Sequence, residues 1–309
     1  MIACFSPGCQ LGGSMRLAST APERWVNPVL ALAVVAISSA AVLVRLAPEA
    51  HPVAVGFWRT AMVAVLLAPG LRRFSSREFL FTALAGLCLA AHFWAWFASL
   101  HQTTVLRSTV LVCLGPIWAG LFEWAVLSLR PSRRFWLGIA LALVGVSGIV
   151  APDSADSAQV SLLGDGLALL GGVLAAIYLM LGRVVRATVP IAAYGSALSA
   201  SAAVWLLIIA SLLGVPLVGF APSTWWVFVG LALGPHLCGH IGFNYALRYR
   251  PASVVGAVTL LEPVGAAALA AWLLQEVPGA RDVFASGIVL VGVYLAMARS
   301  AATLKEAND

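Results

Sequence analysis

The chain has 309 residues, of which 61% are hydrophobic and only 10% are charged, and its formal net charge is +6. Soluble domains carry about 45–50% apolar and about 25% charged residues, so this composition excludes a soluble enzyme, a disordered chain and a nucleic-acid binder. A helical membrane protein remains, because helices that face hydrocarbon must be apolar all round. The five cysteines have no CxxC spacing, so we expect no disulfide framework, no metal and no cofactor.

Ten apolar runs of about 20 residues, the length that crosses a hydrocarbon core of roughly 30 Å, predict an all-α integral membrane protein with ten transmembrane helices. In chain order the predicted helices cover residues 26–46, 52–70, 79–100, 103–129, 135–150, 162–182, 190–214, 225–247, 252–274 and 283–298. Residues 1–25 are polar and rich in proline and glycine. We expect them to form a disordered N-terminal tail, within which Met15 is an alternative start.

The basic residues predict the orientation of these helices. If the N-terminus is cytoplasmic, 14 of the 18 Lys and Arg residues fall in inner segments, and only Arg45, Arg107 and Arg281 fall in outer ones. Short cytoplasmic loops of membrane proteins carry an excess of Lys and Arg. We therefore expect both termini to lie in the cytoplasm.

The sequence contains an internal repeat. The stretch 108–150 resembles the stretch 253–296, and the same interval of 147 residues matches Pro116 to Pro263 and Gly145 to Gly292. We predict two five-helix repeats at 26–150 and 161–300, joined by an outer linker at 151–160 and followed by a cytoplasmic tail at 301–309. Because five is odd, the second repeat enters the membrane from the opposite side, and such inverted repeats are typical of transporters.

Several motifs carry a resemblance to a known family. The motifs are FWRT in the second helix, CLGPIWAGL in the fourth, LGIALALVGVSGIV in the fifth, LLEPVGAAL in the ninth, and the run LLQEVPGARDVFASGIVLVGV. With the two five-helix halves, they resemble the drug/metabolite transporter superfamily, specifically its ten-helix EamA-like members, over residues 26–298. One departure is that Leu129 stands in the first half where the second half has Glu276.

The resemblance implies both a site and a location. It implies a substrate cavity between the halves, lined mainly by the first, third, fourth, sixth, eighth and ninth helices. From bacterial relatives of this kind it also implies export across a bacterial inner membrane.

Two carboxylates lie inside predicted helices. Glu262 lies about ten residues into the ninth helix, near the membrane midplane, where a charged carboxylate costs at least ~2.5–3.5 kcal/mol. It should therefore be protonated, paired or facing a wet cavity. Pro263 removes the hydrogen bond to the Thr259 carbonyl and loosens the helix. Two roles of Glu262 fit this position: it binds a substrate or a proton, or it stabilises a structural kink. Glu123 lies near the inner surface, where we expect it to snorkel or to pair with Arg130, Arg133 or Arg134.

Polar residues recur on one face of two helices. His236, His240 and Asn244 are spaced four residues apart in the eighth helix, and His92, Trp96 and Ser99 share a face of the third. Such faces cannot meet lipid, so we predict two walls of a substrate cavity. The candidate substrate-binding residues are His92, Trp96, Ser99, Trp118, His236, His240, Asn244, Tyr245 and Glu262, and the candidate proton carriers are Glu262, His92 and His240. We expect Arg59 to be structural, with anion binding as the alternative.

These features predict a secondary transporter, specifically an exporter, that moves a small neutral or zwitterionic metabolite such as an amino acid across a lipid bilayer. Phosphorylated substrates require several cations, whereas Lys305 is the only lysine and Arg59 the only arginine well inside a helix. A multidrug or organic-cation exporter that uses Glu262 and an aromatic cage is the alternative. A membrane-embedded enzyme or a channel is the non-transport alternative, although no catalytic triad order or phosphate loop supports an enzyme.

Overall fold

The computed structural model describes residues 23–102, 108, 111–128, 130–150, 161–262, 264–265, 269 and 279–297. The regular secondary structure of these residues is entirely helical. Six helices are long and apolar enough to cross a membrane, and the segments Ala252–Leu261 and Val283–Met297 are shorter apolar helices. The predicted all-helical membrane class is therefore confirmed. The predicted linker and C-terminal tail, most of the N-terminal tail, and Pro263, Glu276 and Lys305 lie outside the described residues.

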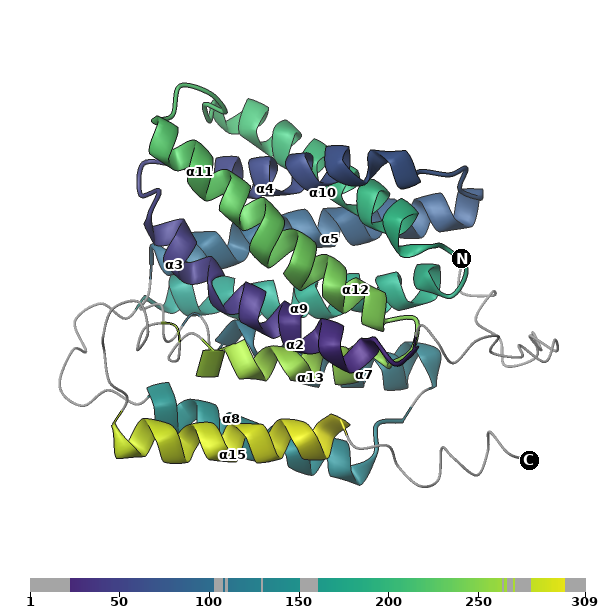
Figure 1. Cartoon of the computed structure of the whole chain (residues 1–309), viewed down its shortest axis with the longest axis vertical. Helices are drawn as coiled ribbons and strands as arrows, with labels where there is room; N and C mark the ends of the chain where they lie inside the picture. Colours follow the sequence, from purple (N-terminus) through teal and green to yellow (C-terminus); the bar gives the residue numbers. More distant parts are fainter. Residues whose placement is uncertain are drawn as a thin grey trace.

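The helices form one bundle, drawn in Figure 1. In the first half they are α2 (Val26–Ser38), α3 (Ala40–Arg45), α4 (Pro52–Leu67) with the short η2 (Ala68–Gly70), α5 (Ser76–Leu100), α7 (Gly115–Leu127) and α8 (Arg133–Val150). In the second half they are α9 (Leu162–Arg186), α10 (Ile191–Leu213), α11 (Pro222–Leu231), η4 (Ala232–Ile241), α12 (Gly242–Ala246), α13 (Ala252–Val258), η5 (Thr259–Leu261) and α15 (Ala280–Met297).

Local sequence signals set the helix ends. Ser75 and Glu78 form a reciprocal capping box, and α5 consequently begins three residues before the predicted span. The Ser161 hydroxyl accepts a hydrogen bond from the Gly164 amide at the start of α9. Gly214 ends α10 with φ +65°, a left-handed conformation that favours glycine. These caps satisfy backbone groups that hydrocarbon would leave without partners.

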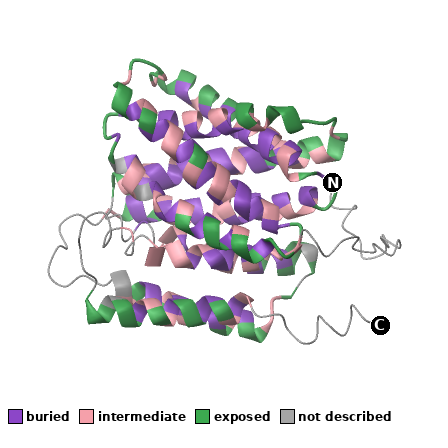
Figure 2. Ribbon diagram, viewed as in Figure 1, coloured by how far each residue is buried: buried purple, intermediate pink, exposed green. Residues whose placement is uncertain are grey.

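The outer surface of the bundle is apolar. Large apolar side chains such as Leu162, Val65 and Phe284 are 84%, 75% and 73% exposed. Figure 2 shows buried residues through the middle of the bundle and exposed residues on its outer faces. Soluble monomers rarely expose apolar surface on this scale, so lipid is the solvent that this surface fits.

The helices of the two halves interlock. Helix α5 packs along α9, α4 along α10 and α8 along α15, while α2 packs against η4, and α7 packs against both α13 and α9. In Figure 1 the pair α8 and α15 lies along the lower edge of the bundle. Each of these pairs joins a helix of the first half to a helix of the second, so the two halves share one core.

Glycines allow α8 and α15 to approach each other closely. A Cβ atom at Gly292 would lie 2.5 Å from the Ala142 nitrogen and 2.7 Å from the Gly138 oxygen. A Cβ atom at Gly145 would lie 2.7 Å from the Ala285 oxygen and 2.8 Å from the Val289 nitrogen. Small residues stabilise helix pairs in membranes because they let backbones come into van der Waals contact.

Glu123 joins three helices instead of pairing with the arginines that follow α7. Its carboxylate accepts hydrogen bonds from the backbone amides of Ala252, at 2.6 Å, and Ser253, at 3.2 Å. Arg183 of α9 lies 3.8 Å from the same carboxylate. The carboxylate thus occupies the N-terminus of α13, where unsatisfied amides favour negative charge, and it ties α7 to α9 and α13.

The glycine contacts generate a stability prediction. Gly292→Ala should destabilise the protein by about 1–3 kcal/mol, the usual cost of overpacking, because the new methyl group would meet the backbone of α8. Gly287 lies on the same helix, and a Cβ atom there would meet nothing within 4 Å, so Gly287→Ala is the matched control. Thermal unfolding of the detergent-solubilised protein measures both, and equal melting temperatures for the two variants would contradict this packing.

Candidate functional site

A small cavity lies between the two halves of the bundle. Its volume is about 70 Å³, which is room for a few water molecules or a small metabolite. The lining comes from α2, α3, α5, the stretch 112–116, α9, η4, α12 and the segment 256–262, with one residue from α4. Its polar and aromatic lining residues are Arg59, His92, Trp96, Cys113, Tyr178, His240, Phe243, Thr259 and Glu262.

Four helical stretches lose regular α-helical geometry beside this cavity. Ser39 separates α2 from α3, turn residues at 113–114 precede α7, η4 is a π-helix, and η5 is a 3-10 helix. Residues that adjoin each irregular stretch line the cavity: Ile37 and Ala40, Cys113 and Gly115, Pro235 and His240, and Thr259 and Glu262. In membrane proteins irregular backbone is tolerated where it lines a cavity, and broken helices often form substrate sites.

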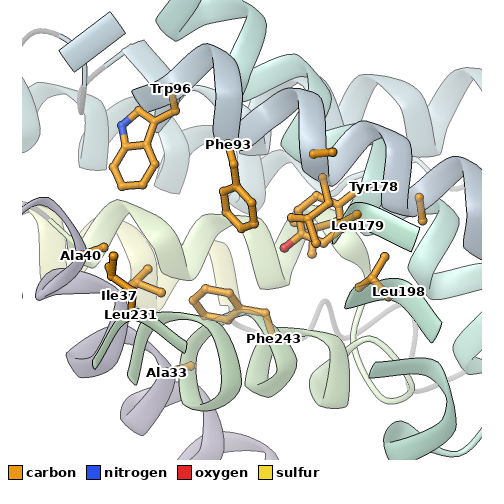
Figure 3. Close-up of a cluster of buried hydrophobic side chains, with 14 of the residues drawn as sticks. Ala33, Ile37, Ala40, Phe93, Trp96, Tyr178, Leu179, Leu198, Leu231 and Phe243 are labelled. Carbon is orange, nitrogen blue, oxygen red and sulfur yellow. The ribbon is translucent and has the colours of Figure 1, made fainter. Parts of the chain in front are cut away.

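Aromatic rings and histidines surround much of the cavity. Figure 3 shows Trp96 and Phe93 projecting from α5 toward Phe243 and Ile37. The His92 ring stacks on Trp96 with centroids 6.2 Å apart and lies 6.0 Å from the His240 ring. The Tyr178 hydroxyl lies 3.0 Å from Nδ1 of His240. The His92 and Trp96 rings of α5 and the His240 ring of η4 therefore lie together beside the cavity.

The hydrogen bond of His92 assigns its ring nitrogens. Nδ1 lies 2.9 Å from the Gly171 carbonyl oxygen, and because a carbonyl can only accept, Nδ1 is the donor. In the neutral ring Nε2 is then left as an acceptor. The same bond holds α5 against α9 beside the cavity.

Arg59 is the most unusual residue of the lining. Its side chain is fully buried, and Nε, Nη1 and Nη2 have no hydrogen-bond acceptor among the described residues. The guanidinium carbon lies 4.2 Å from the centre of the Phe93 ring and 5.8 Å from that of Phe97. Burial of a charge costs several kcal/mol, and a desolvated cation–π contact returns about 2 kcal/mol or somewhat more, so the charge is only partly compensated.

Glu262 contributes the opposite charge to the same cavity. Its side chain is half-buried, and no ion pair within 4.0 Å joins it to Arg59 in the part of the chain that the structure describes. Its backbone carbonyl accepts a hydrogen bond from the Ser38 hydroxyl at 3.3 Å. The Cys113 thiol lies 3.7 Å from the Thr259 carbonyl oxygen. The segment 259–262 is therefore held from α2 and from the turn that precedes α7.

The candidate residues divide into two groups. His92, Trp96, His240 and Glu262 line the cavity, whereas Ser99, Trp118, His236, Asn244 and Tyr245 are not among its lining residues. Ser99 donates to the Trp96 carbonyl, Nε2 of His236 lies 2.9 Å from the Ser199 hydroxyl, and the Asn244 amide donates to the His240 carbonyl. These three side chains support the wall instead of forming it.

The eighth predicted helix contains a π-helical stretch, η4. In η4 the hydrogen bonds span five residues instead of four, so each turn contains more residues than an α-turn. The His236 and His240 rings remain neighbours, with centroids 5.8 Å apart, and both lie against Phe93, but only His240 is among the lining residues. Pro235 lies inside this stretch, and its missing amide removes an α-helical hydrogen bond.

The candidate list omitted five polar or aromatic lining residues: Arg59, Cys113, Tyr178, Phe243 and Thr259. Tyr178 is a single aromatic residue in an apolar run, and Cys113 is one of several scattered cysteines, so neither carries a signal in the sequence. Arg59 was visible as the only arginine well inside a helix. It was expected to be structural, with anion binding as the alternative, and its guanidinium lacks acceptors among the described residues and lines the cavity.

A second, open hollow lies at the ends of α3 and α5 and the start of α4. It includes Glu49, His51, His101 and Gln102. The Thr224 hydroxyl donates a hydrogen bond to Glu49 and holds the pKa of that carboxyl below its ordinary value. Partial burial and the neighbouring His101 lower the pKa of His51. Glu49 anchors this hollow to α11.

The profile of the EamA-like transporter family matches the chain twice, over residues 24–151 and 162–298. The chain belongs to the EamA-like transporter family. It is therefore a membrane transporter of the drug/metabolite transporter superfamily and not an enzyme, as its sequence predicted. The two matches lie on either side of the predicted linker.

Several relatives are named as transport proteins. The chain is 27% identical over 265 residues to the uncharacterized transporter YwfM of Bacillus subtilis, covering 81% of this chain and 86% of that protein. It is 25% identical over 263 residues to an uncharacterized transporter of Archaeoglobus fulgidus, covering 81% and 89%. A shorter match, 32% identical over 79 residues, covers 25% of this chain and 70% of a probable 4-amino-4-deoxy-L-arabinose-phosphoundecaprenol flippase subunit of Klebsiella pneumoniae.

A crystal structure has a similar fold. It superposes with a TM-score of 0.71 and covers 93% of this chain and 99% of the other chain. The sequence identity is 18%, so the likeness concerns the fold alone.

Cys113 provides a test of the cavity. In an EamA-like transporter whose cavity opens to water, a variant that retains only Cys113 should react in proteoliposomes with a charged methanethiosulfonate reagent. A variant that retains only Cys88, a half-buried residue outside the lining, should react far more slowly because lipid excludes the charged reagent. Mass spectrometry measures both rates. Reaction of Cys113 only after unfolding would contradict a cavity that opens to water.

Proposed function

We propose that this EamA-like transporter is a secondary exporter of a small neutral or zwitterionic metabolite such as an amino acid. The observation that carries the proposal is the small cavity between the halves, where four irregular helical stretches surround one buried cation and one carboxylate. Transporter substrate sites near the midplane are typically built from broken helices in this way.

The proposed architecture is ten transmembrane helices in two inverted repeats, at 26–150 and 161–300, with a linker at 151–160 and tails at 1–25 and 301–309. Helix pairing supports it. In chain order, the helices α2, α4, α5, α7 and α8 of the first proposed repeat correspond to α9, α10, η4, α13 and α15 of the second. The contact between α5 and α9 then corresponds to the contact between η4 and α2. The pairs α4–α10, α7–α13 and α8–α15 each join a helix to its own counterpart. The two separate family matches also support two repeats.

Individual contacts follow the same symmetry. Gly145 packs against positions 285 and 289, and Gly292 packs against positions 138 and 142. The interval of 147 residues that matches the two glycines also matches these partners. The same interval of 147 residues matches the turn at 113–114 to residues 260–261 at the end of η5. Equivalent irregularities in inverted repeats favour alternating access, in which the cavity opens to one side and then to the other.

The lining favours a substrate without phosphate. Arg59 is the only Lys or Arg residue among the lining residues, whereas phosphate sites use several cations. The named role of the Klebsiella relative concerns a phosphoundecaprenol lipid, whose phosphate would meet Arg59 as the only Lys or Arg residue of this lining. An organic-cation exporter is the second candidate, because Glu262 lies with Trp96, Tyr178 and Phe243 in the same lining.

Proton coupling belongs to the proposal. Glu262, His92 and His240 all line the cavity, so each can meet water when the cavity opens. A pH profile of transport that flattens in Glu262→Gln and not in the histidine variants would assign the proton to the carboxylate.

Transport through this cavity is tested by filling it. Ala175 lines the cavity from α9, so Ala175→Phe should abolish substrate counterflow in proteoliposomes because the ring occupies the substrate's space. Ala125 is exposed on the outer face of α7, and Ala125→Phe is the matched control. Counterflow of a radiolabelled amino acid mixture measures both. Saturable counterflow that survives Ala175→Phe in a folded protein would contradict the proposed site, and flux without saturation would indicate a channel.

The proposed location is a bacterial inner membrane with both termini in the cytoplasm. In Figure 1 the chain enters α2 and leaves α15 on the same side of the bundle, which agrees with an even number of crossings. A single cysteine introduced at Ser154 should be labelled from outside intact cells, and one at Ser132 only after permeabilisation. The reverse labelling pattern would contradict the orientation.

A further inference from the structure

Arg59 has no hydrogen-bond acceptor among the residues that the structure describes. One ring nitrogen of each neighbouring histidine is engaged elsewhere: Nδ1 of His92 donates to Gly171, Nδ1 of His240 lies against the Tyr178 hydroxyl, and Nε2 of His236 lies against Ser199. Phe93 covers one face of the guanidinium. The three guanidinium nitrogens therefore remain without acceptors on the wall of the cavity.

Glu262 makes the cavity bipolar. It lines the same space as Arg59, although no ion pair forms between the two among the described residues. A ligand with one negative and one positive group satisfies both protein charges at once. A simple cation leaves Arg59 without an anion, and a simple anion leaves Glu262 without a cation, which is costly at a buried site.

We propose that Arg59 and Glu262 form the two poles of a binding site for an amino acid zwitterion. The guanidinium binds the substrate carboxylate through parallel hydrogen bonds, the geometry that arginine and carboxylate share. The Glu262 carboxylate binds the substrate ammonium group. Trp96, Tyr178 and Phe243 contact the apolar remainder of the substrate, and the cavity volume of about 70 Å³ favours a small side chain. This inference rests on the proposed function, because it requires substrate to pass through this cavity.

The site makes a specific prediction about ligand preference. The probes are matched trios: an amino acid, the amine that lacks its carboxylate, and the acid that lacks its ammonium group. The first trio is L-alanine, ethylamine and propionate, and the second is L-leucine, isopentylamine and 4-methylvalerate. Calorimetry on the full-length protein in detergent should give a dissociation constant for the preferred amino acid that is about 30-fold or more below those of its two partners, since each partner leaves one buried charge unpaired.

Substitutions of Arg59 and of Glu262 should change different parts of the ligand preference. Arg59→Gln should weaken amino acid binding by about 30-fold or more and reduce the preference over the amine to about 1. Glu262→Gln should instead remove the preference over the acid while the preference over the amine remains. Arg59→Lys retains the charge without the planar fork and should bind at an intermediate level. It also keeps the test valid if Arg59→Gln does not fold.

A second buried arginine provides the matched control. Arg186 is also buried, but it donates to the backbone carbonyls of Asn244 and Val189 and does not line the cavity. Arg186→Lys should change thermal stability without changing the ligand preference.

The outcomes separate this inference from the proposed function. If the folded Arg59 variants keep the wild-type preference, or if no trio favours the zwitterion, the inference is overturned. The proposed transport pathway still stands in that case, provided that Ala175→Phe blocks counterflow. If Ala175→Phe does not block counterflow, the pathway itself is wrong.

Discussion

The constraint on which the structure depends is that hydrocarbon surrounds the bundle and offers no partner for a polar group. Charged and polar side chains inside the spans must therefore turn inward, and the contacts between helices must satisfy them. Glu123 meets this constraint through the N-terminus of α13, and Arg186 meets it through two backbone carbonyls. Arg59 has no acceptor among the residues that the structure describes, and it lines the same cavity as Glu262.

The irregular helical stretches lie beside the cavity, whereas the closely packed pair α8 and α15 lies away from it. The pair α8 and α15 packs through glycines at backbone contact and lies at the edge of the bundle, away from the cavity lining. The irregular stretches around Ser39, at 113–114, in η4 and in η5 adjoin the cavity. Such stretches can absorb backbone rotation, so we infer that the elements beside the cavity move while the edge pair acts as a scaffold.

Much of the fold could be predicted from the sequence, because hydrocarbon selects apolar runs of a set length. The runs at 52–70 and 190–214 agree closely with α4 with η2 and with α10. The convergence of His92 and His240 was also predictable, since aligned polar residues cannot face lipid. The π-helix of η4 was not predictable, because an apolar run with one proline does not specify which residues its backbone hydrogen bonds join. Arg59 was detected, but its lack of an acceptor depends on tertiary packing that the local sequence does not contain.

The central claim is that the substrate carboxylate pairs with Arg59 and the substrate ammonium group pairs with Glu262. A cryo-electron microscopy structure of the protein with its preferred amino acid bound tests this claim most directly. The account predicts density in the cavity, with the substrate carboxylate within about 2.7–3.2 Å of the Arg59 guanidinium nitrogens and the ammonium group beside Glu262. A direct ion pair between Arg59 and Glu262, with the substrate bound elsewhere, would contradict it.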